Sequence, residues 1–131
     1  MIGTRFFGLF VPRALAFADG IGGGSGKLIA VAALSLDESS EISTYAAHAP
    51  NFLLFDDDGN LKKIIANPYA NLHEDVGDKV VALLEEHHVR LMIAGDFGSH
   101  IADELDKKHI GHIKDIGLAN IAVSAHRKDL P

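Results

Sequence analysis

The sequence predicts an α/β fold, a small mixed sheet in which a β-hairpin is followed by βαβα units. Three observations lead to this prediction. Asp and Asn residues at 56–60 form a turn between two apolar runs, apolar residues from Val76 to Leu84 repeat at helical spacing, and the apolar run 90–94 leads directly into a glycine turn. A hairpin followed by a βαβ unit predicts that the later strands are parallel and joined by right-handed crossovers.

The first half of the chain predicts three strands. Residues 28–34 form a short apolar run, which indicates a buried strand, whereas residues 36–49 have no clear period and indicate a loop. Residues 52–55 form the second predicted strand. At 56–60, Asp and Asn tolerate left-handed backbone and Gly accepts it freely, so this stretch predicts a solvated hairpin turn. Leu61–Ala66 then returns as the third strand.

The second half of the chain alternates helices with strands. Asn67-Pro68 ends the third strand, because proline has no N–H for the ladder. The apolar residues between Val76 and Leu84 lie on one face of a helix, which begins near Asp75 and ends at His87-His88. Residues 90–94 form the fourth strand.

A further helix follows the glycine turn at 95–100. Residues 101–108 carry its apolar spacing, and Gly111 is expected to end it. Residues 112–116 predict a short strand at the edge of the sheet, and residues 121–125 suit a last short helix. An exposed edge strand of this kind allows a monomer or a weak dimer.

Composition narrows the classes of function. The chain has 131 residues, which fits one domain, and a formal net charge of −6, which argues against a nucleic-acid binder. The absence of cysteine rules out disulfides, thiolate zinc sites and cysteine-ligated iron–sulfur clusters. Eight histidines keep metal binding open. No run of about 18 apolar residues exists, so we expect no membrane span and a cytoplasmic protein.

Residues 1–26 are predicted to be an N-terminal extension with a glycine-rich linker, and residues 27–131 the α/β domain. The apolar stretch 6–18 ends in Ala16-Phe17-Ala18, which resembles a signal peptide with a small-residue cleavage site. Pro12-Arg13 interrupts the apolar run, so a dispensable or misassigned extension is the favoured interpretation.

Three histidines are candidate metal ligands. His48 and His73 lie in predicted loops, and His100 lies at a predicted helix start. In this topology such loops can converge at one end of the sheet, where imidazoles would hold a metal or the edge of a cluster. The alternative is that all three are solvated loop histidines.

Gly95, Gly98 and Ser99 form the turn after the fourth strand. Their backbone N–H groups are candidates for an anion or cluster cradle at a helix N-terminus. The alternative is a tight βα turn in which Ser99 caps the helix and Asp103 lies in its first turn. Both interpretations can hold together.

The aspartates at 56–58 raise the possibility of a magnesium-dependent nuclease. Two-metal catalysis needs carboxylates from separate elements that share ions about 4 Å apart. Three successive aspartates in a turn point in different directions, and Asp96 is the one other well-placed acid. A solvated turn is therefore favoured over a nuclease centre.

The order of these pieces resembles the dinitrogenase iron–molybdenum cofactor biosynthesis family, which has a ribonuclease-H-like fold. The resemblance covers about residues 27–130. It rests on the strand entry at 49–55, Asn67-Pro68, the helix end at 86–89, the Ala-Gly-Asp-Phe-Gly turn at 94–98 and the stretch at 108–111. It implies a small non-catalytic domain that binds, carries or protects iron–sulfur or iron–molybdenum type clusters for an acceptor enzyme.

The chain departs from this family in one loop. Where the family carries a His-Phe-Gly-Arg-like segment, whose His is a candidate cofactor ligand, this chain has Tyr45-Ala46-Ala47-His48. Tyr45 therefore stands at the ligand position, and His48 is the candidate substitute. The resemblance favours a cluster carrier, whereas the departure favours an interaction or regulatory module that keeps the fold without a metal.

Overall fold

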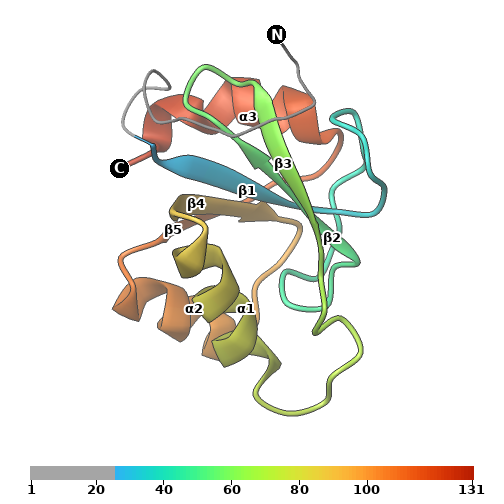
Figure 1. The fold of residues 1–131 in the computed structure, drawn as a ribbon, viewed down its shortest axis with the longest axis vertical. Helices are drawn as coiled ribbons and strands as arrows, with labels where there is room; N and C mark the ends of the chain where they lie inside the picture. Colours follow the sequence, from blue (N-terminus) through green and yellow to red (C-terminus); the bar gives the residue numbers. More distant parts are fainter. Residues whose placement is uncertain (1–25) are drawn as a thin grey trace, which may run out of the picture.

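The computed structural model describes residues 26–131, so the expectations for the N-terminal extension and most of its linker lie outside the described residues. A five-stranded sheet forms the middle layer; α1 and α2 cover one face and α3 covers the other (Figure 1). The elements are β1 (Leu28–Ala33), β2 (Asn51–Phe55), β3 (Leu61–Ala66), α1 (Val76–Glu86), β4 (Val89–Ala94), α2 (Ser99–Lys107), β5 (Gly111–Lys114), α3 (Ala119–His126) and the 3₁₀ helix η1 (Arg127–Asp129).

The sheet is mixed, as predicted. Its strand order is β3-β2-β1-β4-β5. β2 pairs antiparallel with both β1 and β3, whereas β4 pairs parallel with both β1 and β5. In chain order, the hairpin of β2 and β3 comes before β4 and β5, which form the parallel pairings. A helix follows each of β3, β4 and β5.

The central strands are buried on both faces. In β1, Ala30 and Ala32 face α1 and α2, whereas Ile29 and Val31 face α3. The same alternation continues in β2 and β4, because successive side chains of a strand point to opposite faces. This two-sided burial explains why the predicted strands appear in the sequence as continuous apolar runs rather than as alternating patterns.

The two edge strands differ from this centre. β3 exposes Lys62 and Lys63, charges of the kind that discourage pairing with another sheet. β5 forms the opposite edge, as expected for the 112–116 segment. Among the described residues, no helix has the length and apolar character needed to cross a bilayer.

The predicted role of Gly111 at the end of α2 was wrong. His109 takes the left-handed conformation there, at φ 59°, and the Ile110 N–H donates to the Leu105 carbonyl at 2.9 Å in a Schellman arrangement. Gly111 instead begins β5. A Cβ at that position would lie 3.1 Å from Leu91 Cδ1, so the glycine serves close strand packing.

The alternative interpretation in which Ser99 caps α2 is also wrong. Gly98 is the N-cap residue and has extended backbone, so α2 already includes Ser99 and has no side-chain cap. Asp103 consequently lies beyond the first turn, which contains no acidic residue. The start of α2 therefore keeps its N–H groups uncapped by side chains.

The hairpin turn is less solvated than predicted. Asp56 is 7% exposed, and its Oδ1 accepts hydrogen bonds from Asp58 N–H at 3.0 Å and Asn60 N–H at 2.8 Å. One oxygen of each aspartate at 56–58 lies within 4.8 Å of the others, so the three side chains do not diverge as expected. The buried Asp56 holds the turn together from inside.

Candidate functional site

Three loops meet at one end of the sheet. β1, β3 and β4 run in the same direction, because β2 is antiparallel to β1 and β3 while β4 is parallel to β1. Their carboxyl ends therefore share one edge, the usual position for a binding crevice in open α/β sheets. The loop that follows β1, the loop 67–75 after β3 and the turn 95–98 after β4 all leave from this edge.

A pocket of about 460 Å³ lies between these loops and the starts of α1 and α2. All three candidate metal-ligating histidines line it, although they come from three separate parts of the chain. Two of the other predicted cofactor-binding residues line it as well. The lining residues that bear on function are Tyr45, His48, His73, Asp96, Gly98 and His100.

The ring of His48 is held in one tautomer. Its Nδ1 lies 3.0 Å from the Ala70 carbonyl oxygen, which only accepts hydrogen bonds, so Nδ1 carries the proton and donates. In the neutral imidazole, this tautomer keeps the lone pair on Nε2. Metal-ligating histidines commonly show this arrangement, with one ring nitrogen donating to a backbone carbonyl and the other free to coordinate.

A buried amide ties the His48 loop to the loop after β3. Asn67 is 8% exposed, and its Nδ2 donates to the carbonyls of Ala47 and Ala49, each at 2.9 Å. Its Oδ1 accepts from the Tyr69 N–H, also at 2.9 Å. From the sequence, Asn67 was expected only to end the third strand, whereas its side chain also positions the loop that carries His48.

The turn after β4 gives fewer free N–H groups than a full cradle needs. The Gly95 and Asp96 N–H groups donate to the Ser43 and Thr44 carbonyls at 2.9 and 2.7 Å, and the Phe97 N–H donates to the Asp96 carboxylate. Gly95 and Ser99 do not line the pocket. The unpaired N–H groups are therefore those of the first turn of α2.

Gly95 has a packing role instead. A Cβ at this position would lie 2.8 Å from the Thr44 backbone Cα, a distance at which something must shift. The glycine thus lets β4 end directly against the loop that carries Tyr45.

Asp96 brings a negative charge to the pocket. Its Oδ1 lies 3.1 Å from Lys114 Nζ, and it is exposed. The hydrogen bond from Lys114, together with the Phe97 N–H and the charge of Lys114, holds the pKa of Asp96 below its ordinary value. The carboxylate therefore stays ionised beside the histidines at neutral pH.

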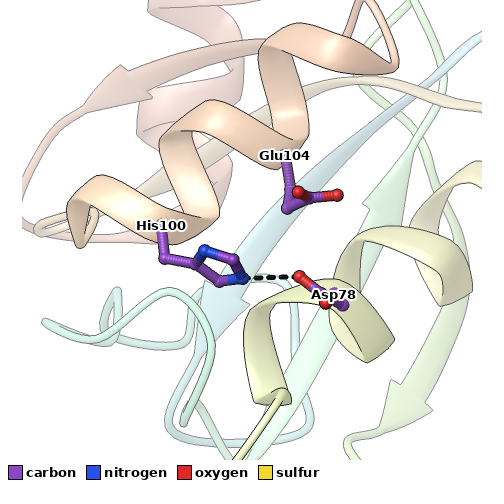
Figure 2. A group of neighbouring side chains, drawn as sticks. All are labelled: Asp78, His100 and Glu104. Atoms are coloured by element: carbon purple, nitrogen blue, oxygen red, sulfur yellow. Dashed lines mark hydrogen bonds and ion pairs between the residues drawn. The ribbon is translucent and has the colours of Figure 1, made fainter.

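His100 differs from the other two histidines because it has a carboxylate partner. Its Nε2 lies 2.6 Å from Asp78 Oδ1, and Figure 2 shows this contact between α2 and α1, with Glu104 one helical turn further along α2. Asp78 and Glu104 were both missed at the sequence level. The spacing of His100 and Glu104, four residues apart on one helix, was the signal that would have found Glu104.

The pocket histidines do not form a compact three-nitrogen site. Within residues 26–131, the sets that bring three ligand atoms within 4.8 Å of one another are Asp78, His100 and Glu104, and the three aspartates at 56–58. His48, His73 and His100 are therefore arranged around a volume larger than one ion.

A two-metal nuclease centre does not fit the topology. Phe55, next to Asp56, pairs with Ile29 near the start of β1, whereas Asp96 follows the end of β4. Because β1 and β4 are parallel, the aspartates at 56–58 and Asp96 lie at opposite ends of the sheet. They cannot share ions about 4 Å apart.

Comparisons with known proteins agree with this fold. The sequence profile described as dinitrogenase iron–molybdenum cofactor matches residues 27–125. The apo form of the orange protein from Desulfovibrio gigas is similar over 79% of this chain and 88% of its own, with a TM-score of 0.72 and 17% identity, and so supports the fold alone.

A second solved structure is similar at higher sequence identity. It is a Thermotoga protein of the DUF35 family, named as a candidate NifB protein, and it is 26% identical over 77% of this chain and 87% of its own, with a TM-score of 0.66. No curated protein gives a significant match to this chain.

Proposed function

This chain belongs to the dinitrogenase iron–molybdenum cofactor family, and we propose that it binds and carries a metal-containing cofactor or cluster as cargo, without catalysing a reaction. The observation that carries the proposal is that His48, His73 and His100 line one and the same pocket at the carboxyl edge of the sheet. The absence of cysteine leaves imidazole as the main ligand for the cargo metals.

Each pocket residue has a distinct role in this proposal. His48 coordinates through Nε2, since the Ala70 carbonyl holds its Nδ1 proton, and His73 and His100 supply further imidazoles. Tyr45, 66% exposed on the pocket lining, offers a hydroxyl at the position where the family carries its candidate ligand histidine. Gly98 leaves the first N–H groups of α2 without a side-chain cap, and these suit sulfide or oxide edges of an iron–sulfur or iron–molybdenum type cluster.

The exposure of the site suits a carrier. His48, His73 and His100 are all exposed, so a cluster bound there stays accessible to an acceptor enzyme. A protein that stored its cofactor permanently would be expected to bury it. We expect the transfer to take place in the cytoplasm, with the chain acting as a monomer or weak dimer.

The test is reconstitution of untagged protein under anaerobic conditions with an iron–sulfur or iron–molybdenum cluster donor. We expect stoichiometric metal and a new charge-transfer band, and we expect His48→Ala and His73→Ala each to reduce retention at least tenfold. His109→Asn is the matched control, because His109 is exposed, outside the pocket and left-handed, a conformation that Asn tolerates. A protein that stays colourless and metal-free would overturn the proposal.

An interaction or regulatory module without metal is the second candidate, and one surface favours it. Large apolar side chains are exposed where the loop 34–42 meets residues 116–121, with Ile116 83%, Ile121 62% and Leu36 61% exposed. Backbone hydrogen bonds, such as Ile42 N–H to the Gly117 carbonyl at 2.9 Å, hold the two segments together. Under this alternative, Ile116→Asp and Ile121→Asp abolish capture of a stable partner, and added metal has no effect on that capture.

A further inference from the structure

Three side chains from α1 and α2 converge beside the histidine pocket. Asp78 lies in the first turn of α1, and His100 and Glu104 lie on successive turns of α2. One ligand atom of each lies within 4.8 Å of the other two. Figure 2 shows the His100 ring and the Asp78 carboxylate directed toward one another, with Glu104 beside this contact on the next turn of α2. The donor set is one imidazole nitrogen and two carboxylate oxygens.

We propose that Asp78, His100 and Glu104 bind a divalent first-row transition-metal ion, for which Zn²⁺ is the natural probe. Imidazole and carboxylate are the ligands such ions accept when thiolates are absent. Ligand atoms about 2.1 Å from one ion lie roughly 3.0–3.4 Å from one another. The ion takes the place of the proton between His100 Nε2 and Asp78 Oδ1, now 2.6 Å apart, and draws Glu104 inward by a side-chain rotation.

The charges around the site favour a cation. Asp78 and Glu104 face the ion directly. Asp75, the N-cap residue of α1, and Asp103 on α2 add negative charge nearby. Lys107 is the cation that pairs with this group, and it contacts Glu104 Oε2 at 2.9 Å. Glu104 Oε1 is the other oxygen of that carboxylate, so coordination does not require Lys107 to leave.

The helices are packed so that the ligands meet. Gly77 precedes Asp78 and is buried against α2. A Cβ at Gly77 would lie 3.2 Å from His100 Cδ2 and 3.4 Å from Ile101 Cβ. The missing side chain therefore lets the His100 ring approach α1, and the site is built on two helices rather than on mobile loops.

This ion site goes beyond the proposed carrier function but shares one residue with it. His100 lines the pocket and also belongs to the ion site. Three protein ligands leave coordination positions open for water or for a donor atom of the cargo. A resident ion would in addition link α1 to α2 across their interface.

The test uses the full untagged chain after treatment with a chelator. Zn²⁺ is titrated by calorimetry, and Co²⁺ is titrated by its visible absorption, which reports the ligand geometry. We expect one ion per chain, and we expect Asp78→Asn and Glu104→Gln each to weaken binding at least tenfold. Asp103→Asn is the matched control, because it removes the same charge from an exposed neighbour on α2 outside the ligand set, and it should change affinity less than about twofold.

Every outcome decides for or against the site. The absence of stoichiometric Zn²⁺ uptake would overturn the proposed site. Equal losses of Zn²⁺ affinity in Glu104→Gln and Asp103→Asn would also overturn it, because they would indicate a diffuse effect of surface charge. If Zn²⁺ binding is lost in His48→Ala but kept in Glu104→Gln, the ion lies in the histidine pocket, and this result would overturn the proposed site as well. Zn²⁺ binding without cluster uptake would support the ion site while rejecting the carrier function, so the two proposals fail separately.

Discussion

Replacing Asn67 by Ala tests whether one buried amide holds the histidine pocket together. The substitution removes two donated hydrogen bonds, to the Ala47 and Ala49 carbonyls, and one accepted from the Tyr69 N–H, all at 2.9 Å. The Ala49 carbonyl is buried in this contact, whereas the other two groups are part-buried and reach water more easily once Asn67 is gone.

The expected loss of stability follows from this difference. An unpaired buried carbonyl costs about 2 kcal/mol, and each hydrogen bond that water partly replaces costs about 0.5–1 kcal/mol. We therefore expect Asn67→Ala to lower the free energy of unfolding by about 3 kcal/mol. For a domain of this size that corresponds to a Tm lower by roughly 10–20 °C.

Urea unfolding followed by circular dichroism measures the loss, and the m-value should stay unchanged. The control is Asn71→Ala, the same chemical change at an exposed position in the same loop. We also expect Asn67→Ala to weaken cluster retention, because the loop that carries His48 loses its tie to the loop after β3. A loss below 1 kcal/mol, or a loss equal to that of Asn71→Ala, would refute the reasoning.

Three further predictions concern the same end of the sheet. Gly95→Ala places a Cβ 2.8 Å from Thr44 Cα, so overpacking should cost about 1–3 kcal/mol in urea unfolding, and an unchanged midpoint would contradict the packing role. Because the pKa of Asp96 is held below its ordinary value of 3.8 by Lys114, the pair stabilises the fold above that pH and loses its effect as pH falls through the lowered pKa. Thermal melts of wild type and Asp96→Asn should therefore differ at pH 7, and the difference should shrink as the pH falls below 3.8; a constant difference would exclude the pair as the cause. Gly77→Ala should raise helix propensity by up to about 1 kcal/mol yet weaken Zn²⁺ binding, since its Cβ would displace the His100 ring; equal Zn²⁺ affinity in the two proteins would argue against that positioning role.

The sequence predicted the secondary structure well because the relevant signals are local. Continuous apolar runs marked the central strands, and the spacing from Val76 to Leu84 marked α1. Where the signal was a single residue it was less reliable. Gly111 looked like a helix terminator, but α2 ends at Lys107 and His109 takes the left-handed position that follows its cap. The glycine was needed instead for close contact with Leu91 from another strand.

The sequence by itself determined the elements, their order, the mixed sheet and the family, since backbone preference and burial periodicity are encoded within a few residues of each position. Only the tertiary structure decided which polar residues meet. His48, His73 and His100 share a pocket because the order β3-β2-β1-β4-β5 brings the ends of β1, β3 and β4 to one edge. Asp78 meets His100 because α1 and α2 pack on the same face of the sheet. Contacts between residues this far apart in the chain depend on the packing of whole elements, which no local pattern carries.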